Sequence, residues 1–424
     1  MHDLRLVREG LDDLREAMRR RGELDALGPQ LDRCEGLERE RRLLIQAVEE
    51  RKAARNASSQ EVARRKRAGE PAEDLITTGR ALGEEISRLE RELADAEGQL
   101  ASILLEIPNV TAPDVPEGDE SHNVIVRTWG VPRPSEGVRP HWEIAAEHGL
   151  VDVERAAKIS GSGFALLRGV GARLVRSMLS FFLDVHAREH GYEEVWPPVL
   201  VNRTSMTGTG QLPKFEDDAY RIEGDDLFLI PTAEVPVTNL YRDEILDGAA
   251  LPMALCAYTP CFRREAGSAG KDTRGVLRVH QFDKVELVRY CAPERSDAEL
   301  ATLLGHAESI LQRLGIPYRV KLLAAGDTGF ASAKTYDLEA WAPGVGAWLE
   351  VSSCSTFTDF QARRSNIRFR PAKGEKPRFV HTLNGSGVAV PRTFACILEH
   401  YQQPDGSVIV PDVLRPYFGS DRIG

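Results

Sequence analysis

The sequence has no long apolar run and no apolar core behind its N-terminus, MHDLRLVREG. A membrane-spanning helix needs about twenty mostly apolar residues, and a secretory leader needs a shorter apolar core, so we expect neither. The 6 cysteines form no CxxC pair and no Cys/His spacing typical of a metal site. These absences predict a cytoplasmic protein without structural zinc, whose thiols are reduced and mostly buried.

An excess of positive charge is also missing. The formal net charge is −10 over 424 residues, which argues against a protein that coats nucleic acid with its whole surface. Contact with RNA would need a local basic patch. A chain of this length is expected to hold two or three domains.

Aromatic residues and proline are nearly absent up to Glu106, and this part of the chain has the composition of helices. An apolar residue recurs every three or four positions, which is the pattern of a coiled-coil seam. The seam consists of Leu82, Ile86, Leu89, Leu93, Ala96, Leu100 and Ile103. A second striped run covers roughly Pro29 to Lys66, and the string AGEPAEDL separates the two runs. Residues 1–106 are therefore predicted to form an arm, an antiparallel helical hairpin that projects into solvent.

Cations gather near the predicted turn of this hairpin. Between Arg51 and Arg67 the cations are Arg51, Lys52, Arg55, Arg64, Arg65, Lys66 and Arg67, against Glu61 alone, so the local charge is seven minus one, or +6. A solvated helix face accounts for such a run. An RNA-binding end accounts for it as well, because phosphate contacts dominate affinity for RNA. The charges alone leave both interpretations open.

The composition changes after Glu106. Residues 107–134 are rich in Pro, Asp and Gly and are predicted to be a linker. Residues 135–424 alternate strand-like and helix-like segments and are predicted to form a second domain. Within them, GYEEVWPPVLV is typical of an edge strand, because Pro197 and Pro198 cannot donate ladder hydrogen bonds.

The string FRREAGSAGKDTRGVLRVHQFDKVE, residues 262–286, predicts two strands joined by a loop of glycine, serine and cations. The loop is not a P-loop. Gly267 stands three residues before Gly270 instead of five, and Asp272 takes the place of the required Ser or Thr. A phosphate site here would therefore depend on side-chain charge more than on a backbone cradle.

Two arginines at the loop entrance could supply that charge. Arg263 and Arg264 carry planar guanidinium groups that pair with phosphate or carboxylate oxygens. On the returning strand, period-two alternation places on one face His280, Phe282, Lys284 and Glu286. An ordinary hairpin with a solvated charged loop is the alternative interpretation.

Three further strings contain candidate site residues. The Thr-Ala-Glu of IPTAEVP could simply begin a helix. In AWLEVSSCS, Glu350 is a carboxylate suited to hold magnesium against phosphate oxygens. Strict alternation puts Glu350 and Ser353 on opposite faces, so the strand ends, a bulge intervenes, or one of the two does not line the site. In LNGSGVAVPR, Arg392 follows Pro391 at the start of a predicted helix, where it could meet a phosphate.

Together these strings resemble the motifs of class II aminoacyl-tRNA synthetases, in the form carried by the seryl-tRNA synthetases. FRREAGSAGKDTRG resembles motif 2, GYEEVWPPVLV resembles motif 1, and LNGSGVAVPRTF resembles motif 3. The resemblance covers essentially the whole chain, arm and linker included. It implies an α+β fold, in which residues 135–424 form a class II catalytic domain on an antiparallel sheet and residues 1–106 form a tRNA-binding helical arm.

The resemblance also implies a site for ATP, L-serine and Mg²⁺. ATP would be bound by Arg263, Arg264, Glu265, Phe282, Glu350, Val351, Ser352, Ser353 and Arg392. Serine would be bound by Thr232, Ala233, Glu234, Arg263, Glu286, Asn384 and Ser386. Glu350 and Ser353 would hold magnesium, and Arg263, Glu350 and Arg392 would act in catalysis.

The implied activity is ATP-dependent ligation of L-serine to tRNA(Ser) through seryl-adenylate. The resemblance further implies a homodimer formed through the motif 1 region, and it leaves open whether tRNA(Sec) is serylated too. Two alternatives remain: an amino-acid:carrier-protein ligase, and an inactive tRNA-binding paralogue.

Overall fold

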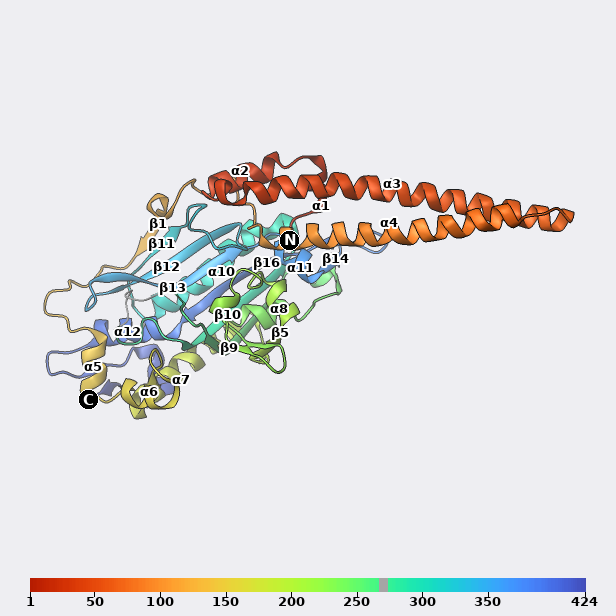
Figure 1. Cartoon of the computed structure of the whole chain (residues 1–424). Helices are drawn as coiled ribbons and strands as arrows, with labels where there is room; N and C mark the ends of the chain where they lie inside the picture. The colour runs from red at the N-terminus through yellow and green to blue at the C-terminus, as the bar shows by residue number, and fades with distance from the viewer. Residues whose placement is uncertain (267–273) are drawn as a thin grey trace. The chain divides into compact units, whose positions relative to one another are not determined.

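The computed structural model describes residues 1–266 and 274–424 (Figure 1). Contacts within the chain divide it into two compact units, Met1–Pro108 and Asn109–Gly424. We describe each unit separately.

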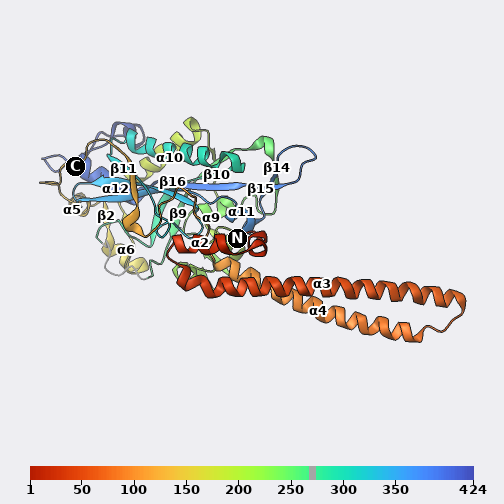
Figure 2. The same ribbon diagram turned by 90° about the horizontal axis from the view of Figure 1, so that it is seen from above.

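Two long antiparallel helices make up most of the first unit. α3 (Leu24–Ala68) and α4 (Glu73–Glu106) run side by side (Figures 1 and 2). At 1.5 Å per residue they are about 68 and 51 Å long. Gly69 ends α3 with φ 72°, a left-handed conformation that glycine adopts without strain. Two short helices, α1 (Leu4–Glu9) and α2 (Asp12–Arg20), precede α3.

The predicted helical hairpin is confirmed. Ile86, Leu89, Ala96 and Leu100 of the α4 seam are buried. α3 begins at Leu24, earlier than predicted, because Pro29 lies inside the helix without ending it.

The second unit is built on an eight-stranded sheet. From edge to edge the strands are β1 (Val124–Trp129), β11 (Tyr318–Leu322), β12 (Lys334–Ala342), β13 (Ala347–Thr356), β16 (His381–Ala389), β10 (Gln281–Cys291), β9 (Met253–Phe262) and β4 (Glu193–Glu194). Neighbouring strands are antiparallel, except that β4 is parallel to β9. The predicted α+β fold with an antiparallel sheet is confirmed, and β4 of GYEEVWPPVLV lies at an edge.

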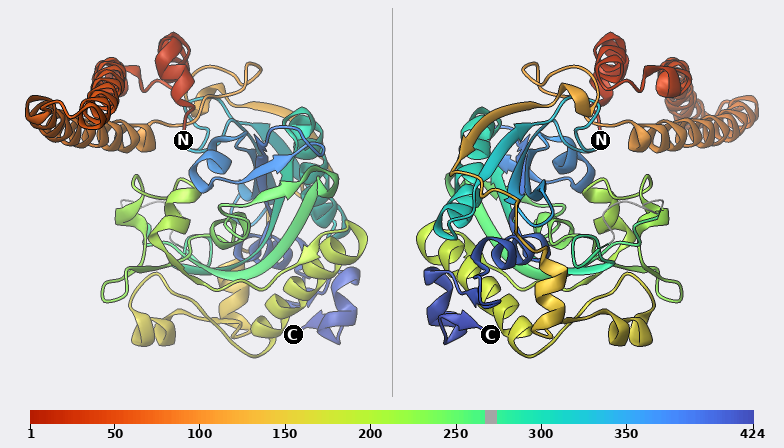
Figure 3. Two further views of the ribbon diagram at one scale, coloured as in Figure 1. Left: turned by 90° about the vertical axis from the view of Figure 1, so that its right-hand side faces the viewer. Right: turned by 90° about the vertical axis from the view of Figure 1, so that its left-hand side faces the viewer.

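Helices cover one face of this sheet and form the core with it. α7 (Gly169–Asp184), α10 (Ser296–Arg313) and α12 (Val390–Tyr401) pack against its central strands (Figure 3). Leu174, Phe182, Leu303 and Phe394 of these helices are fully or nearly fully buried among strand residues. The opposite face of the sheet remains available for a site.

Shorter elements complete the second unit. The helices are α5 (His141–Glu147), α6 (Val153–Ser160), α8 (Arg203–Gly208), α9 (Glu234–Thr238), α11 (Phe360–Ser365) and α13 (Arg415–Phe418), and a π-helical turn (Val185–Glu189) continues α7. The strands are β2 (Val151–Asp152), β3 (Leu166–Leu167), β5 (Leu200–Asn202), β6 (Arg221–Ile222), β7 (Leu227–Leu229), β8 (Ile245–Asp247), β14 (Arg368–Arg370), β15 (Arg378–Phe379), β17 (Val408–Ile409) and β18 (Arg422–Ile423).

The segment predicted as a linker, 107–134, contains more structure than expected. Its residues Val124–Trp129 form β1, which pairs with β11 at the sheet edge. The Asn109 side chain also donates hydrogen bonds to the carbonyls of Phe357 (2.9 Å) and Ala331 (3.0 Å). The physical reason for the difference is the β-branched run VIV, which favours a strand behind a stretch rich in proline.

Two expectations drawn from absences can be compared with this structure. All six cysteines are free and buried, which confirms that the thiols are mostly buried. Within residues 1–266 and 274–424, no helix is both long enough and apolar enough to cross a membrane.

Candidate active site

A cavity of about 480 Å³ opens on the sheet face opposite α7 and α10. The alternation of β16 shows how the two faces are divided. Asn384 and Ser386 line the cavity, whereas a side chain at Gly385 would collide with Leu303 of α10. The residues between the polar ones must therefore be small, because the helices pack closely behind them.

Alternation along β10 brings to the cavity wall three residues that were expected on one face of this strand. Phe282, Lys284 and Glu286 all line it, as the period of two requires. His280 is not part of this wall and stacks on Phe164, with the ring centres 5.3 Å apart. It also accepts or donates a hydrogen bond at 2.8 Å with the Tyr220 hydroxyl.

The two arginines that follow β9, Arg263 and Arg264, have different surroundings. Arg263 lines the cavity, and its guanidinium carbon lies 5.3 Å from the centre of the Phe282 ring. Arg264 is exposed and is not part of the cavity wall. Glu265 lines the cavity and accepts a 2.5 Å hydrogen bond from Arg278 Nη1, which lines it too. The GSAGKDT string compared with a P-loop, 267–273, lies outside the described residues.

A buried polar cluster occupies one part of the wall. The Glu286 carboxylate accepts a 2.9 Å hydrogen bond from Asn384 Nδ2 and is ion-paired with Lys284. Lys284 Nζ also donates to Thr232 Oγ1 at 2.9 Å. Ser386 lines the cavity beside this cluster. Thus four of the predicted serine-binding residues, Thr232, Glu286, Asn384 and Ser386, are brought together.

Glu234 adds a second buried carboxylate to the cluster. It lines the cavity and accepts a 2.6 Å hydrogen bond from Gln361 Nε2. Burial, together with the neighbouring Glu286, raises the pKa of Glu234 to about 7. Burial likewise raises the pKa of Glu286. Ala233, predicted with them, is buried but does not line the cavity.

A bulge in β13 resolves the conflict over Glu350 and Ser353. Across the strand pair, Asp337 lies opposite Ser353 and Glu339 lies opposite Glu350. Two steps along β12 therefore face three steps along β13, with Val351 as the extra residue. Glu350, Val351 and Ser353 consequently all line the cavity.

Ser352 is placed differently from the prediction. Its hydroxyl is buried and donates a 2.7 Å hydrogen bond to the Ser386 carbonyl, outside the cavity wall. The bulge explains this orientation, because it brings the residues on both sides of Ser352 to the cavity.

Arg392 lies at the start of α12 and faces Glu350. Its Nη1 donates a 2.7 Å hydrogen bond to the Glu350 carbonyl and lies 3.7 Å from a carboxylate oxygen of the same residue. Its Nε donates to the Leu277 carbonyl at 3.4 Å. Arg392 lines the cavity with Pro391, so the predicted helix start does carry an arginine into the site.

The donors near Glu350 fit a magnesium ion held jointly with phosphates. The Glu350 carboxylate and the Ser353 hydroxyl are hard oxygens on one wall, and Mg²⁺ is typically bound by one or two carboxylates plus substrate phosphates. Within the described part of the chain, no group of three or more His, Cys, Asp or Glu side chains could hold a metal by itself.

Sequence reasoning missed two cations of this cavity. Lys284 was placed on the correct face but given no role, and Arg278 was not considered. Alternation with Phe282 and Glu286 was the available signal for Lys284. Arg278 lies before the first residue of β10, so no strand periodicity marked it.

Comparison with known proteins gives the following matches. The family model "tRNA synthetase class II core domain (G, H, P, S and T)" matches residues 214–401, and the model "Seryl-tRNA synthetase N-terminal domain" matches residues 1–111. The chain is 63% identical over 420 residues to the serine--tRNA ligase of Gemmatimonas aurantiaca, with 99% of both chains covered. It is 56% identical to that of Thermomicrobium roseum, with 100% of this chain and 95% of the relative covered.

Among solved structures, the seryl-tRNA synthetase from Pyrococcus horikoshii complexed with ATP has the same fold. The TM-score is 0.94 at 39% sequence identity, with 100% of this chain and 99% of that chain covered.

Proposed function

This chain belongs to the seryl-tRNA synthetases and is a serine--tRNA ligase that uses ATP. We propose that seryl-adenylate is formed in the cavity described above and that the helical arm binds tRNA(Ser). The observation that carries this proposal is the separation of charges in the cavity. The neighbouring buried carboxylates Glu234 and Glu286 form one part of its wall. Arg278 and Arg392 form another part, since Arg392 is hydrogen-bonded to the carbonyl of Leu277, the residue before Arg278. An α-ammonium suits the first part and phosphate oxygens suit the second.

In the first reaction, a carboxylate oxygen of serine attacks the α-phosphorus of ATP and pyrophosphate leaves. Arg263, which lines the cavity beside Phe282, neutralises the carboxylate and α-phosphate as they approach. Phe282 presents an aromatic face for adenine. Arg392 binds the departing pyrophosphate, and Glu350 with Ser353 would hold Mg²⁺, which adds positive charge to the phosphates when bound. Positioning and charge carry this step, so no protein nucleophile is needed.

Selection of serine follows from the buried polar cluster. Glu286, Asn384 and Thr232 present oxygens and an amide that a hydroxyl group can satisfy. A substrate without the hydroxyl leaves buried groups unpaired, which discriminates more strongly than the loss of a methyl group. In the second reaction, the 3′-hydroxyl of the tRNA attacks the adenylate carbonyl, forming the ester and releasing AMP.

Pyrophosphate exchange without tRNA tests the activation step. The enzyme should exchange with serine and should reject threonine, alanine and glycine. Preference for alanine or glycine would instead favour a carrier-protein ligase, and absence of any exchange would favour an inactive paralogue.

The second candidate property is tRNA binding by specific cations of the arm. Four of the seven cations between Arg51 and Arg67 are already ion-paired. Across the helix pair, Arg51 pairs with Glu85 at 3.0 Å and Lys52 with Glu90 at 2.7 Å. These cations are less available for phosphate, because a carboxylate already neutralises each of them.

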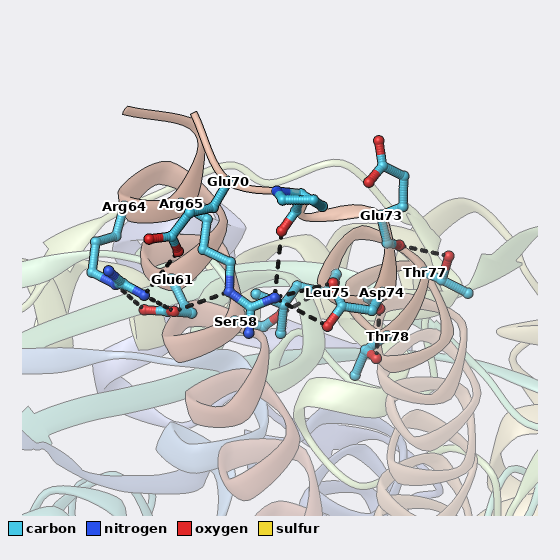
Figure 4. A network of polar contacts seen from close by, with 11 residues as sticks. Ser58, Glu61, Arg64, Arg65, Glu70, Glu73, Asp74, Leu75, Thr77 and Thr78 are labelled. Atoms are coloured by element: carbon cyan, nitrogen blue, oxygen red, sulfur yellow. Dashed lines mark hydrogen bonds and ion pairs between the residues drawn. The ribbon is translucent and has the colours of Figure 1, made fainter. Parts of the chain in front are cut away.

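The turn of the arm holds the other two paired cations (Figure 4). Arg64 and Arg65 both bind Glu61, at 2.7 and 3.2 Å, and Arg65 also reaches Asp74 at 3.2 Å. Arg65 Nη1 further donates to the carbonyl of Pro71 at 3.4 Å. These contacts tie α3 to the turn and to α4, so we assign Arg64 and Arg65 to the structure of the tip.

Arg55, Lys66 and Arg67 are exposed, and none makes an ion pair with the described residues. Arg55 and Lys66 are eleven positions apart, about three helical turns, so they lie on one stripe roughly 16 Å long. We assign tRNA phosphate contacts to these three residues.

Salt dependence of tRNA(Ser) affinity separates the two groups of cations. Arg55→Gln, Lys66→Gln and Arg67→Gln should each weaken binding and lower the salt slope by about one. Arg51→Gln and Lys52→Gln are matched controls of the same residue types and should leave the slope unchanged. All five variants should keep serine-dependent exchange. Equal losses in both groups, or none in either, would contradict this assignment.

Three finer properties complete the proposal. Homodimerisation through the motif 1 region is supported by two exposed apolar side chains, Trp196 after β4 (78% exposed) and Leu200 at the start of β5 (39% exposed). Sedimentation should give a dimer. The enzyme is proposed to act in the cytoplasm, with residues 1–106 and 135–424 as its working domains. Serylation of tRNA(Sec) is expected in the same charging assay as tRNA(Ser), since a shared arm surface would bind both.

A further inference from the structure

Lys284 is a buried cation in the serine-binding part of the cavity. It is 6% exposed, it lies on β10 between Phe282 and Glu286, and it lines the cavity. Its ammonium group is ion-paired with Glu286 and donates to Thr232 Oγ1 at 2.9 Å. Burying a lysine ammonium costs free energy unless an opposite charge matches it. The ion pair with Glu286 therefore indicates that Lys284 has a defined role in the cavity.

The charges around Lys284 do not balance in the empty cavity. Two buried carboxylates, Glu234 and Glu286, face one lysine ammonium. The other groups near Glu234 are the neutral amide of Gln361, which donates to it at 2.6 Å, and the more distant guanidinium of Arg263. Among the described residues no cation is ion-paired with Glu234. Its carboxylate can therefore pair with a positively charged group of a ligand.

The α-ammonium of serine supplies the missing positive charge. With Lys284 matching Glu286 and the ammonium matching Glu234, both glutamates can be carboxylates at once. Two neighbouring buried carboxylates without two cations instead share a proton. The pKa of Glu234, raised to about 7 by burial and by Glu286, agrees with a group that becomes fully charged only when its partner arrives.

We propose that Lys284 is a positioning residue of the serine pocket: it fixes Glu286 as a carboxylate and holds the Thr232 hydroxyl, so that serine is bound by two ionised glutamates. This inference depends on the proposed activation of serine. The groups around Glu234 and Glu286 come from six parts of the fold. They are Lys284 on β10, Cys261 on β9 and Arg263 just after it, Thr232 before α9, Gln361 on α11, Cys354 on β13, and Asn384 on β16.

The test compares Lys284→Met with the wild-type enzyme in serine-dependent pyrophosphate exchange. Without the lysine, one glutamate keeps its proton, and binding by two carboxylates needs a higher pH. The KM for serine at pH 7.5 should rise about tenfold or more, and the pH midpoint of that KM should move up by about one unit. The KM for ATP should change less than about twofold, because Lys284 contacts Glu286 and Thr232 of the serine-binding cluster. Lys284→Arg should restore part of the serine affinity, because it restores the charge.

Lys321 offers a matched control. It is ion-paired with Glu339 at 2.7 Å but does not line the cavity. Lys321→Met should leave the KM for serine and its pH midpoint unchanged, whatever it does to stability. An unmoved midpoint in Lys284→Met would overturn the inference.

A measurement on the unmodified enzyme keeps the inference testable if Lys284→Met does not fold. Calorimetric titration with serine at pH 7, in two buffers of different ionisation enthalpy, should show a net release of protons on binding. Binding without proton release would contradict a pocket of two ionised glutamates. Absence of serine exchange by the wild-type enzyme would be a different failure, that of the proposed function itself.

Discussion

Replacing Glu286 by glutamine should separate the structural and the catalytic roles of one buried carboxylate. The Glu286 side chain is 1% exposed and is ion-paired with Lys284. Glutamine keeps the shape and can still accept from Asn384, but it removes the ion-pair partner of the buried Lys284. Removal of one partner from a buried ion pair typically costs about 3–5 kcal/mol. The free energy of unfolding should therefore fall by roughly that amount in urea titrations at pH 7.5.

The same substitution should weaken serine activation. A hydrogen bond to a charged group contributes about 1.5–3 kcal/mol, and each 1.4 kcal/mol is about a factor of ten. The value of kcat/KM for serine in pyrophosphate exchange should fall roughly 10- to 100-fold, while the KM for ATP changes little.

Glu350→Gln is the control, because its carboxylate side chain is 48% exposed. It should change unfolding by less than about 0.5 kcal/mol and should raise the requirement for ATP and magnesium without changing the KM for serine. The reasoning is refuted if Glu286→Gln is as stable as the wild type, or if the two variants share one kinetic phenotype.

Two other predictions concern pH and packing. The pKa of Glu234 is raised from 4.5 to about 7, so the serine KM should fall about tenfold from pH 6 to pH 8, and Glu234→Gln should remove this dependence. Because the pKa of Glu234 is higher in the folded than in the unfolded protein, its contribution to stability should be lost as pH rises from about 4.5 to 7. Equal pH profiles for the unfolding of the wild type and of Glu234→Gln would contradict this loss. A Cβ at Gly387 would lie 2.7 Å from His186 Nε2, so Gly387→Ala should cost about 1–3 kcal/mol in urea unfolding. Gly224→Ala, where a Cβ meets nothing within 4 Å, is the control, and equal stability of the two variants would count against tight packing behind β16.

Periodicity of the sequence was sufficient to predict which residues share a face of a regular helix or strand. The α4 seam, with Ile86, Leu89 and Leu100 buried, follows from spacings of three and four along one helix. The face of β10 follows in the same way from the period of two. Both depend only on residues within a single element, so the sequence contains the whole pattern.

Charge on the arm could be counted but not assigned. The surplus near its tip is visible in the sequence, whereas the partners of Arg51 and Lys52 lie on the other helix, at Glu85 and Glu90. Which cations remain unpaired is decided by the alignment of α3 against α4. That alignment is a property of two helices, and no single helix pattern specifies it.

The site depends on two irregularities that alternation cannot reveal. In β13 the extra residue Val351 brings Glu350 and Ser353 to one wall. β16 has a second bulge, where the three steps from Ser386 to Ala389 face two steps on β10. Within it Val388 has a φ of 87°, a conformation that is strained for a β-branched residue. A bulge is defined by the register of the neighbouring strand, so each strand read alone remains regular. Alternation puts Ser352 on the same face as Glu350, and the resemblance assigns it to the ATP site, whereas its hydroxyl is bonded to the Ser386 carbonyl. Residues that carry the chemistry at a bulge have to be identified from pairing between strands.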